Sequence, residues 1–448
     1  MPPSLKSKIE LGRRSGSDVV GLDIQPGFVA AVQVRLNGAI LAERAAAAVL
    51  PADAMREGDV ADPTAVTEAL RELFASSRLG KRVRVGVANQ RTVMRTLELP
   101  PVTDAKELAA AVQFQAQDQI PMPLASAVMD FHALGVVDTP AGPRQKVVVV
   151  AAQRDMIDRL LTVVRGAGLT PVGIDLSAFA LIRSLHRSAP EEAGRVLYLN
   201  VDGLTNVVIA EGNVCHFTRV VAGGFEEMAL ELAERRGVPL TDARALLAAV
   251  DLSAPEPEEG SPLHGSGAGP EGATEVNASG PSKAEGEQVV SSEPAEDPLD
   301  GDAPDADAVS GDVAPEDAEP DASDPRKLPS EDAAAMPLTE QRPATSEGSQ
   351  PNDAEARLVL ENGVRVISSE VRNSLDFHRS QGGGGDVTRV VLSGLVLDLP
   401  GFAEALQASL GVDVHPAAVG VTDESLARHV STHRLAVAAG LAAAEVPQ

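Results

Sequence analysis

Apolar and polar residues alternate along residues 18–48, a pattern typical of strands that bury one face of a sheet. Asn37 and Gly38 interrupt the alternation between Val34 and Ile40, and this pair favours a tight hairpin turn. A meander of strands is therefore predicted here. Shorter apolar runs predict further strands at residues 83–88, 92–99, 147–152, 171–175, 195–210, 214–221, 387–393 and 412–414.

Segments with helical spacing of apolar residues lie between these strands. Val66, Leu70 and Phe74 follow Asp62 and Pro63, and proline in the first turn favours the start of a helix. The same kind of pattern predicts helices at residues 103–119, 155–167, 226–236, 358–380, 400–410 and 432–444.

The helix predicted at residues 103–119 has a start signal and a stop signal. Thr103 is the predicted cap, because its hydroxyl can accept from a free N–H of the first turn. The sequence Ile120-Pro121-Met122-Pro123 predicts the end, because proline removes a helical donor and restricts the residue before it.

Residues 147–152 are apolar throughout, as in a strand that is buried on both faces. A helix at residues 155–167 and a strand at residues 171–175 follow. This strand, helix, strand order predicts a parallel crossover and an α/β core.

The composition changes at residues 253–354, which are rich in Ala, Pro, Glu, Asp, Ser and Gly. No aromatic residue lies between Phe225 and Phe377. Such a segment buries too little apolar area to offset the entropy of ordering it, so we expect a disordered acidic linker. Residues 255–350 hold 24 acidic and 4 basic residues, which leaves only −7 of the formal net charge of −27 for the remainder.

Composition also excludes several functions. Without a basic face the folded part is not expected to bind nucleic acid. Cys215 is the one cysteine, so no intramolecular disulfide forms and we interpret this residue as packing. The histidines show no metal-ligand spacing, and no apolar run is long enough to cross a bilayer. Residues 1–17 are expected to be a flexible basic tail.

Four stretches of the chain together resemble the PilM family of type IV pilus assembly proteins, which is related to FtsA and to actin. The first is Gly21-Leu22-Asp23-Ile24, and the second runs from Ala111 to Pro123. The third combines Val149 and residues 151–154 with Ala167-Gly168-Leu169 and with residues 175–180, and the fourth runs from Glu370 to Gln381. In their order and spacing these stretches match the family, and together they extend over nearly all of the chain outside the acidic linker.

The resemblance implies an actin-like α/β fold with two RNase H-like halves around a nucleotide cleft. The first half would span residues 18–190, with a small inserted subdomain near residues 50–140. The second would span residues 191–252 and 355–444, with a carboxyl-terminal helix that returns to the first half.

The resemblance also implies a cytoplasmic protein at the inner membrane that grips the cytoplasmic tail of a PilN-like membrane protein. The partner groove would involve the helix that precedes the proline stop. The residues assigned to it are Phe114, Gln117, Ile120, Pro121, Met122 and Pro123, each of which also fits a helix end beside a core.

The first phosphate loop expected of an actin-like ATPase is altered at Gln25 and Pro26. Gln25 stands where glycine lets the backbone approach a ligand, and Pro26 has no N–H to donate. Gly27 can still form the turn, while Phe28 and Ala30 replace a hydroxyl residue and a lysine. Asp23 is either a turn former or a Mg²⁺ partner.

The other nucleotide motifs deviate in the same direction. The second loop retains Asp202, Gly203 and Thr205 but is shortened, and the adenosine motif retains only Gly394 of its glycines. These four residues, with Asp23 and Gly27, are the candidate ATP site. Each lost phosphate contact costs about 1–3 kcal/mol, so we expect no turnover and no resident cofactor, although ATP and Mg²⁺ binding stays open.

Two alternatives remain. An active ATPase or kinase of the same fold would need a general base and intact phosphate loops. An FtsA-like division protein would need an amphipathic membrane helix at its carboxyl end, and the Ala-rich segment that ends at Gln448 does not have that pattern. The preferred hypothesis is a non-catalytic, PilM-like adaptor.

Overall fold

The computed structural model describes residues 18–187, 194–221, 223–254, 353–380 and 385–443. The predicted basic tail at residues 1–17 and nearly all of the predicted acidic linker lie outside these described residues.

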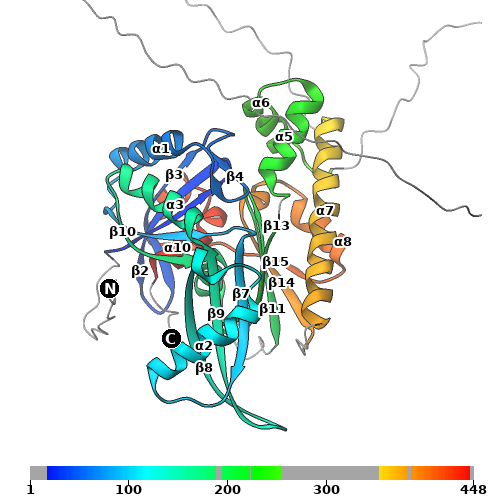
Figure 1. Ribbon diagram of the computed structural model, residues 1–448. Coiled ribbons are helices and arrows are strands. Elements are labelled where there is room, and N and C mark those ends of the chain that lie inside the picture. The colour runs from blue at the N-terminus through cyan, green and yellow to red at the C-terminus, as the bar shows by residue number, and fades with distance from the viewer. Residues whose placement is uncertain (1–17, 188–193, 222, 255–352, 381–384, 444–448) are drawn as a thin grey trace, which may run out of the picture. The chain divides into compact units, whose positions relative to one another are not determined.

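A six-stranded mixed sheet forms the first half of the fold (Figure 1), in the order β10-β6-β1-β2-β3-β16. β1, β2 and β3 are antiparallel neighbours, and β6 and β10 continue the sheet in parallel. The hairpin predicted at Asn37-Gly38 is confirmed, because Gly38 has the positive φ that the turn requires. The bounds are β1 Val20–Gln25, β2 Phe28–Leu36, β3 Ile40–Val49, β6 Arg82–Val87, β10 Thr170–Leu176 and β16 Gly420–Val421.

A five-stranded sheet repeats this pattern in the second half, in the order β13-β12-β11-β14-β15. Three antiparallel strands are again extended by parallel ones. The bounds are β11 Arg195–Val201, β12 Thr205–Glu211, β13 Val214–Val221, β14 Val387–Ser393 and β15 Val414–Pro416. The two halves therefore share one topology, which places the β1–β2 turn and the β11–β12 turn at equivalent positions.

Helices cover both sheets. α1 and α3 pack together beside the first sheet, while α5, α6, α7 and α8 pack around the second (Figure 1). Asp62 caps α1 through Thr64 and Ala65, as its sequence predicts. The bounds are α1 Pro63–Ser76, α3 Arg154–Gly166, α5 Phe225–Arg236, α6 Leu240–Ala248, α7 Ala354–Ser380, α8 Phe402–Leu410 and α9 Glu424–Ala427.

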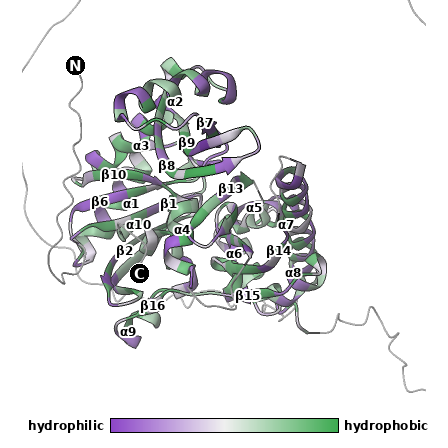
Figure 2. Ribbon diagram, turned by 90° about the horizontal axis from the view of Figure 1, so that it is seen from below, coloured by the Kyte–Doolittle hydropathy of each residue, from purple (hydrophilic) through white to green (hydrophobic). Residues whose placement is uncertain are grey.

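The Ala-rich helix α10 (Ala436–Ala442) is buried among elements that lie far away in sequence. It packs against α4 (Ser177–Leu185) and against β1 and β2 of the first sheet (Figure 2). A Cβ atom added at Gly21 would overlap the carbonyl oxygen of Ala438, and one at Gly440 would overlap that of Ala180. Small residues thus let three backbones approach closely at the centre of the core.

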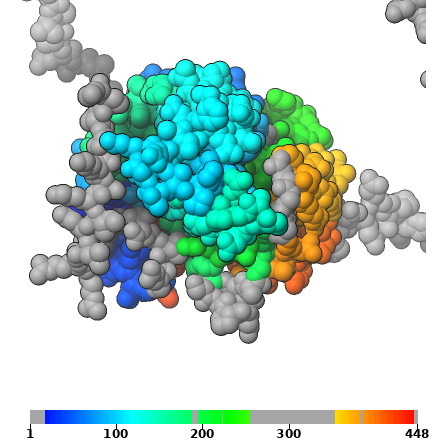
Figure 3. Space-filling view, turned by 60° about the horizontal axis from the view of Figure 1, so that its bottom comes forward, coloured from blue at the N-terminus to red at the C-terminus, as the bar shows by residue number. Residues whose placement is uncertain are grey.

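A small subdomain is inserted between β6 and α3. β7 (Thr92–Leu99), β8 (Ala127–Thr139) and β9 (Gly142–Gln153) form an antiparallel sheet in the order β7-β9-β8. One face of this sheet packs on α2 (Ala105–Gln119) through a core that includes Val147, Val149 and Ala151. Figure 3 shows this subdomain, in cyan, on the face of the molecule that lies nearest the viewer.

The parallel crossover predicted from residues 147–175 is wrong. β9 lies in the small sheet, with antiparallel neighbours on both sides, and β10 lies in the first sheet. The strand, helix, strand order arises because the chain returns from the inserted subdomain to the first half through α3. The run of β9 is apolar throughout because one face of the strand packs on α2 and the other faces the first half. The parallel pairs of the described residues are instead β1 with β6, β6 with β10, β3 with β16, β11 with β14, and β14 with β15.

The predicted cap Thr103 is also wrong. α2 is capped by Asp104, whose Oδ1 accepts from the N–H groups of Lys106 and Glu107, both at 2.9 Å. The Asp104 carboxylate is a better acceptor than the Thr103 hydroxyl, and Asp104 is the residue directly before the first turn, whose N–H groups it can reach.

Candidate functional site

The turns of the two repeated hairpins lie against each other. A Cβ atom added at Gly203, in the β11–β12 turn, would overlap the carbonyl oxygen of Pro26 in the β1–β2 turn. The two backbones are therefore in direct contact at this point. This is the place where the resemblance puts the triphosphate between the phosphate loops.

Gln25 bridges the two turns. Its Nε2 donates to Oδ2 of Asp23 at 2.7 Å, and its Oε1 accepts from the N–H of Leu204 at 3.4 Å. The side chain is buried, with an exposed fraction of 1%. The Gln25 amide thus binds the Asp23 carboxylate of the first turn and the Leu204 N–H of the second turn. In a nucleotide site of this fold, such a carboxylate would face the cation and such an N–H would face the phosphate.

Asp202 is held by groups from distant segments of the chain. Its Oδ1 accepts from Nε of Arg434 at 2.9 Å and from the N–H of Leu395 at 3.0 Å. Asn200 approaches Oδ2 at 3.5 Å and in turn accepts from the hydroxyl of Ser393 at 2.9 Å. The carboxylate therefore already has a cation and a backbone donor as partners.

Arg434 also fills space beside the first turn. Its guanidinium carbon lies 3.4 Å from the centre of the Phe28 ring, a cation–π arrangement. On the other side of that turn, a Cβ atom added at Gly27 would overlap the carboxylate of Glu226. Glu226 is in turn paired with Arg244, whose Nε lies 3.0 Å from its Oε2. Two ion pairs and an aromatic ring thus surround the turn.

Burial dominates the electrostatics of the two aspartates. It raises the pKa of Asp23 to about 7, with a further rise from Asp202, while the hydrogen bond from Gln25 and the charge of Arg434 act in the opposite direction. The pKa of Asp202 is also raised by burial, against the lowering effect of Arg434. Close to neutral pH the pair therefore holds less negative charge than two exposed carboxylates.

Gly394 and Thr205 complete this junction. Gly394 has φ +103, and its N–H donates to the carbonyl of His433 at 3.1 Å. Any Cβ there would overlap the carbonyl of Val201, so the glycine serves a close backbone approach. The Thr205 hydroxyl donates to the carbonyl of Gly223 at 3.1 Å.

The structure brings the six residues of the candidate ATP site to one junction, but most of their polar groups have protein partners there. They are Asp23, Gly27, Asp202, Gly203, Thr205 and Gly394. The donor set fits a bound triphosphate poorly, because Pro26 has no N–H and Gln25 takes the N–H of Leu204. Across the residues that the structure describes, no group of three or more His, Cys, Asp and Glu side chains could hold a metal ion.

Sequence reasoning missed Arg434 and Glu226. The one signal for Arg434 is its place directly before the apolar run from Leu435 to Ala443, where a lone cation next to a buried helix requires a partner.

A second feature is an apolar groove of about 330 Å³ between the small subdomain and the first half. Alternate residues of β9 point to opposite faces of the small sheet, so Val148 and Val150 face the groove while Val147 and Val149 face α2. β8 supplies Val128 to the groove, and β10 and α4 supply the opposite wall.

The six predicted partner residues lie on α2 and directly after it. None of them lines the groove, because α2 covers the other face of the small sheet. Ile120 is buried in the core beneath α2, while Phe114 is 74% exposed. The positions of the six are Phe114 and Gln117 on α2, Ile120 at its carboxyl cap, and Pro121, Met122 and Pro123 after it.

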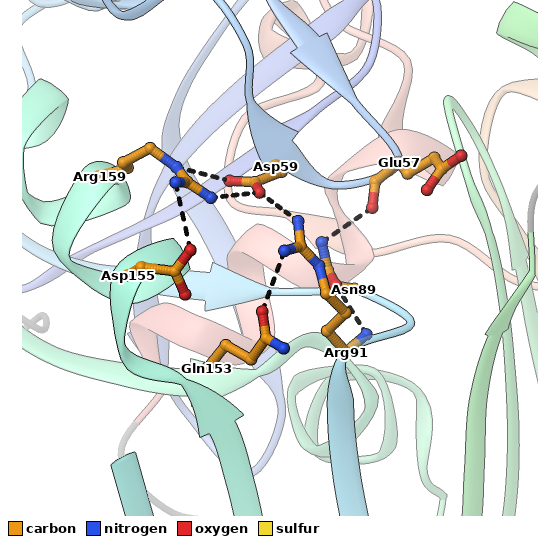
Figure 4. A network of polar contacts seen from close by, with 7 residues as sticks. All are labelled: Glu57, Asp59, Asn89, Arg91, Gln153, Asp155 and Arg159. Atoms are coloured by element: carbon orange, nitrogen blue, oxygen red, sulfur yellow. Dashed lines mark hydrogen bonds and ion pairs between the residues drawn. The ribbon is translucent and has the colours of Figure 1, made fainter. Parts of the chain in front are cut away.

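A polar network joins the small subdomain to the first half at the two chain crossings (Figure 4). Asp59 pairs with Arg91 and, at 2.6 Å, with Arg159 of α3. Nδ2 of Asn89 donates to the carbonyl of Glu57 at 2.9 Å, and Arg91 donates to Gln153 at 3.0 Å. Residues 89–92 and 153–154 are these two crossings, here called the hinge, and the network holds them to the first half.

The repeated topology, the opposed hairpin turns and the inserted subdomain define a protein of the actin-like ATPase fold. The sequence pattern described as "Type IV pilus assembly protein PilM" matches residues 21–249, which is more than half of the 448 residues. The chain therefore belongs to this family, and the resemblance derived from the sequence is confirmed.

The chain is also similar to solved structures. The structure titled "PilM-PilN type IV pilus biogenesis complex" is 20% identical, with 96% of this chain and 98% of that chain covered and a TM-score of 0.61. The ethanolamine utilization protein EutJ from Carboxydothermus hydrogenoformans is 13% identical over 94% and 88% of the two chains, with a TM-score of 0.44. A ROK hexokinase from Thermus thermophilus is 12% identical over 94% and 97%, with a TM-score of 0.33. The first of these shows the fold alone, and the predicted α/β architecture of two RNase H-like halves with an inserted subdomain is confirmed.

Within the described residues, no helix combines the length and the apolar character that a membrane span requires.

Proposed function

We propose that this chain is a PilM-like adaptor of a type IV pilus or related secretion system. In this proposal it works in the cytoplasm, at the inner membrane, and binds the cytoplasmic tail of a PilN-like membrane protein without turning over ATP. Membership of the family supports the adaptor role, and a related structure is described as a complex of PilM with PilN.

The observation that carries the proposal is the apolar groove between two edge strands. β8 is the edge of the small sheet and β10 is the edge of the first sheet, and both line the groove. An edge strand has unpaired backbone N–H and C=O groups, which an extended peptide can use while its alternate side chains enter apolar pockets. The tail is therefore expected to bind in an extended conformation.

The charges of the groove fit a tail that emerges from a membrane. Asp130 and Asp175 are among its lining residues, and Asp130 is exposed. Asp175 is already paired with Arg183. Cytoplasmic segments next to a membrane span are rich in Lys and Arg, so a short apolar segment flanked by basic residues would complement this surface.

Loss of turnover is proposed from the junction of the hairpin turns. Gln25, Arg434 and the contact of Gly203 with Pro26 use the space and the polar groups that phosphate would need. An enzyme of this fold would also require a general base that faces an attacking water. The active ATPase alternative therefore predicts saturable binding of Mg-ATP, which the adaptor proposal does not.

The experiment is a titration of the full chain with a synthetic peptide that has the sequence of the PilN-like protein's cytoplasmic tail. Isothermal calorimetry should give saturable binding for the wild type. Val128→Asp and Ile174→Asp should each weaken it at least tenfold, because each places a charge on the apolar lining. Both side chains are partly exposed, at 39% and 37%, so folding should persist.

Phe114→Asp is the matched control, since Phe114 is exposed on α2 at the other face of the small sheet. Unchanged affinity in this variant and weak affinity in the groove variants supports the groove. The reverse pattern would instead place the partner on α2, and absence of binding to the wild type would reject the adaptor proposal.

A further inference from the structure

We propose that a second cavity, between the two halves and the hinge of the small subdomain, binds a small oxyanion of the carboxylate or phosphate type. The cavity has a volume of about 250 Å³. Its walls come from the end of β6, the start of β7, the first turn of α4, the start of β12 and the end of β13. This cavity is next to the peptide groove, since Val87 and Leu176 line both, but the inference goes beyond the adaptor function.

Asn206 provides the main observation. It lines the cavity, its exposed fraction is 1%, and its buried Nδ2 has no hydrogen-bond partner among the described residues. A buried amide donor without an acceptor is costly, and such groups are normally satisfied. A ligand oxygen in the cavity would supply the missing acceptor.

A second polar atom at this site shares that property. The hydroxyl of Thr92, which also lines the cavity, is buried without a partner in the described part of the chain. Hydroxyl groups can donate to an anion. Two unpaired donors, one from β12 and one from β7, thus lie around one hollow.

The first turn of α4 gives the site its preference for negative charge. α4 begins at Ser177 and has nine residues, and no side chain caps it, since the residue before it is Leu176. Its first N–H groups therefore lack a side-chain acceptor, and the positive end of the helix dipole lies at the cavity wall.

The charged lining is consistent with an anion. Arg219 is a lining residue, and no acidic residue is among those that line the cavity. Its guanidinium also pairs with Glu370, at 3.1 Å, so part of its charge is already balanced. Asn206, the Thr92 hydroxyl and the start of α4 therefore carry most of the recognition.

The remaining wall is apolar, with Val87, Met94 and Leu176 among its residues. An anion that has a short hydrocarbon body, such as a small carboxylate, would use both walls, whereas free phosphate would use only the polar one. Both ligands present an oxyanion, and butyrate and inorganic phosphate serve as the two probes that distinguish a carboxylate from a phosphate.

The test uses the full chain in chloride buffer, titrated by calorimetry with sodium butyrate and, separately, with inorganic phosphate at constant ionic strength. Saturable binding of either probe is expected and supports the site, and the tighter probe identifies the source. No saturable binding of either overturns the proposal. A crystal structure that shows only ordered water in the cavity at saturating probe also overturns it.

Asn206→Leu should weaken binding of the probe at least tenfold, because it removes the unpaired donor and keeps the number and branching of the side-chain heavy atoms. In chloride buffer its melting temperature should equal or exceed that of the wild type, since no existing hydrogen bond is lost. Asn213→Leu, in the exposed β12–β13 turn, is the matched control and should bind as the wild type does.

Equal affinity in the wild type and in Asn206→Leu would place any bound anion elsewhere and overturn the assignment. If Asn206→Leu fails to fold, Thr92→Val provides the same comparison with a nearly isosteric change, and it is expected to weaken binding severalfold.

Discussion

Gln25 and Asp23 lie two residues apart in β1, and Nε2 of Gln25 donates a 2.7 Å hydrogen bond to Oδ2 of Asp23. The same side chain accepts from the N–H of Leu204 in the opposite turn. One amide therefore connects the two halves of the fold at the point where an actin-like ATPase would hold phosphate. This relationship leads to the first prediction.

Gln25→Ala should lower the free energy of unfolding by about 1–3 kcal/mol, because it leaves the buried Asp23 and the Leu204 N–H without their partner. It should not create an ATP site, because Pro26 still has no N–H and Gly203 still contacts it. Thermal melts with and without Mg-ATP measure both effects. The exposed Gln117→Ala is the control, and saturable stabilisation of the variant by Mg-ATP would contradict the prediction.

Asp23→Asn should make the protein more stable at pH 8 than the wild type and flatten its pH dependence. Burial raises the pKa of Asp23 to about 7, so the folded chain retains a proton that the unfolded chain releases near the ordinary pKa of 3.8. This group therefore lowers stability as the pH rises between those two values.

The full effect at pH 8 is on the order of 4 kcal/mol, and it should vanish near pH 4. Asp202 and Arg434 also face Asp23 and remain in the variant. Chemical denaturation of both proteins from pH 4 to pH 8 gives the two curves, and parallel curves would show that Asp23 does not titrate in this range.

Gly203→Ala should destabilise the protein by about 1–3 kcal/mol, because the added Cβ overlaps Pro26 and the two turns must separate. Gly80→Ala is the matched control, since the nearest atom to its added Cβ is at 3.6 Å, an ordinary contact. Urea denaturation compares the two variants. Equal stabilities would mean that the turns are not in contact in solution.

Asp59→Asn should weaken the hinge of the small subdomain, because Arg91 and Arg159 share this carboxylate (Figure 4). Both guanidiniums are partly exposed, so the expected loss is about 1–2 kcal/mol. Hydrogen exchange should increase at residues 89–92 and 153–154. Asp155→Asn, which removes only the more exposed pair at 3.3 Å, serves as the control and should leave exchange there nearly unchanged.

Local signals in the sequence correctly predicted much of the fold. The Asn37-Gly38 turn, the start of α1 at Pro63 and the strand Val387–Ser393 each depend on a few neighbouring residues, and each is confirmed. The crossover predicted at residues 147–175 was wrong because it did not depend on neighbouring residues alone. An apolar run does not reveal which sheet its strand joins. Sheet membership depends on partners that lie elsewhere in the chain.

The altered first turn was likewise visible in the sequence, because the missing N–H of Pro26 and the bulk of Gln25 are properties of those residues themselves. The sequence alone thus determined the family and the unusual residues of the first turn. Only the tertiary structure decided that Arg434 neutralises Asp202 from 232 residues away, that the groove lies on the face of the small sheet opposite α2, and that Nδ2 of Asn206 has no hydrogen-bond partner among the described residues. Those features depend on which surfaces meet when distant segments pack, and no local pattern encodes that choice.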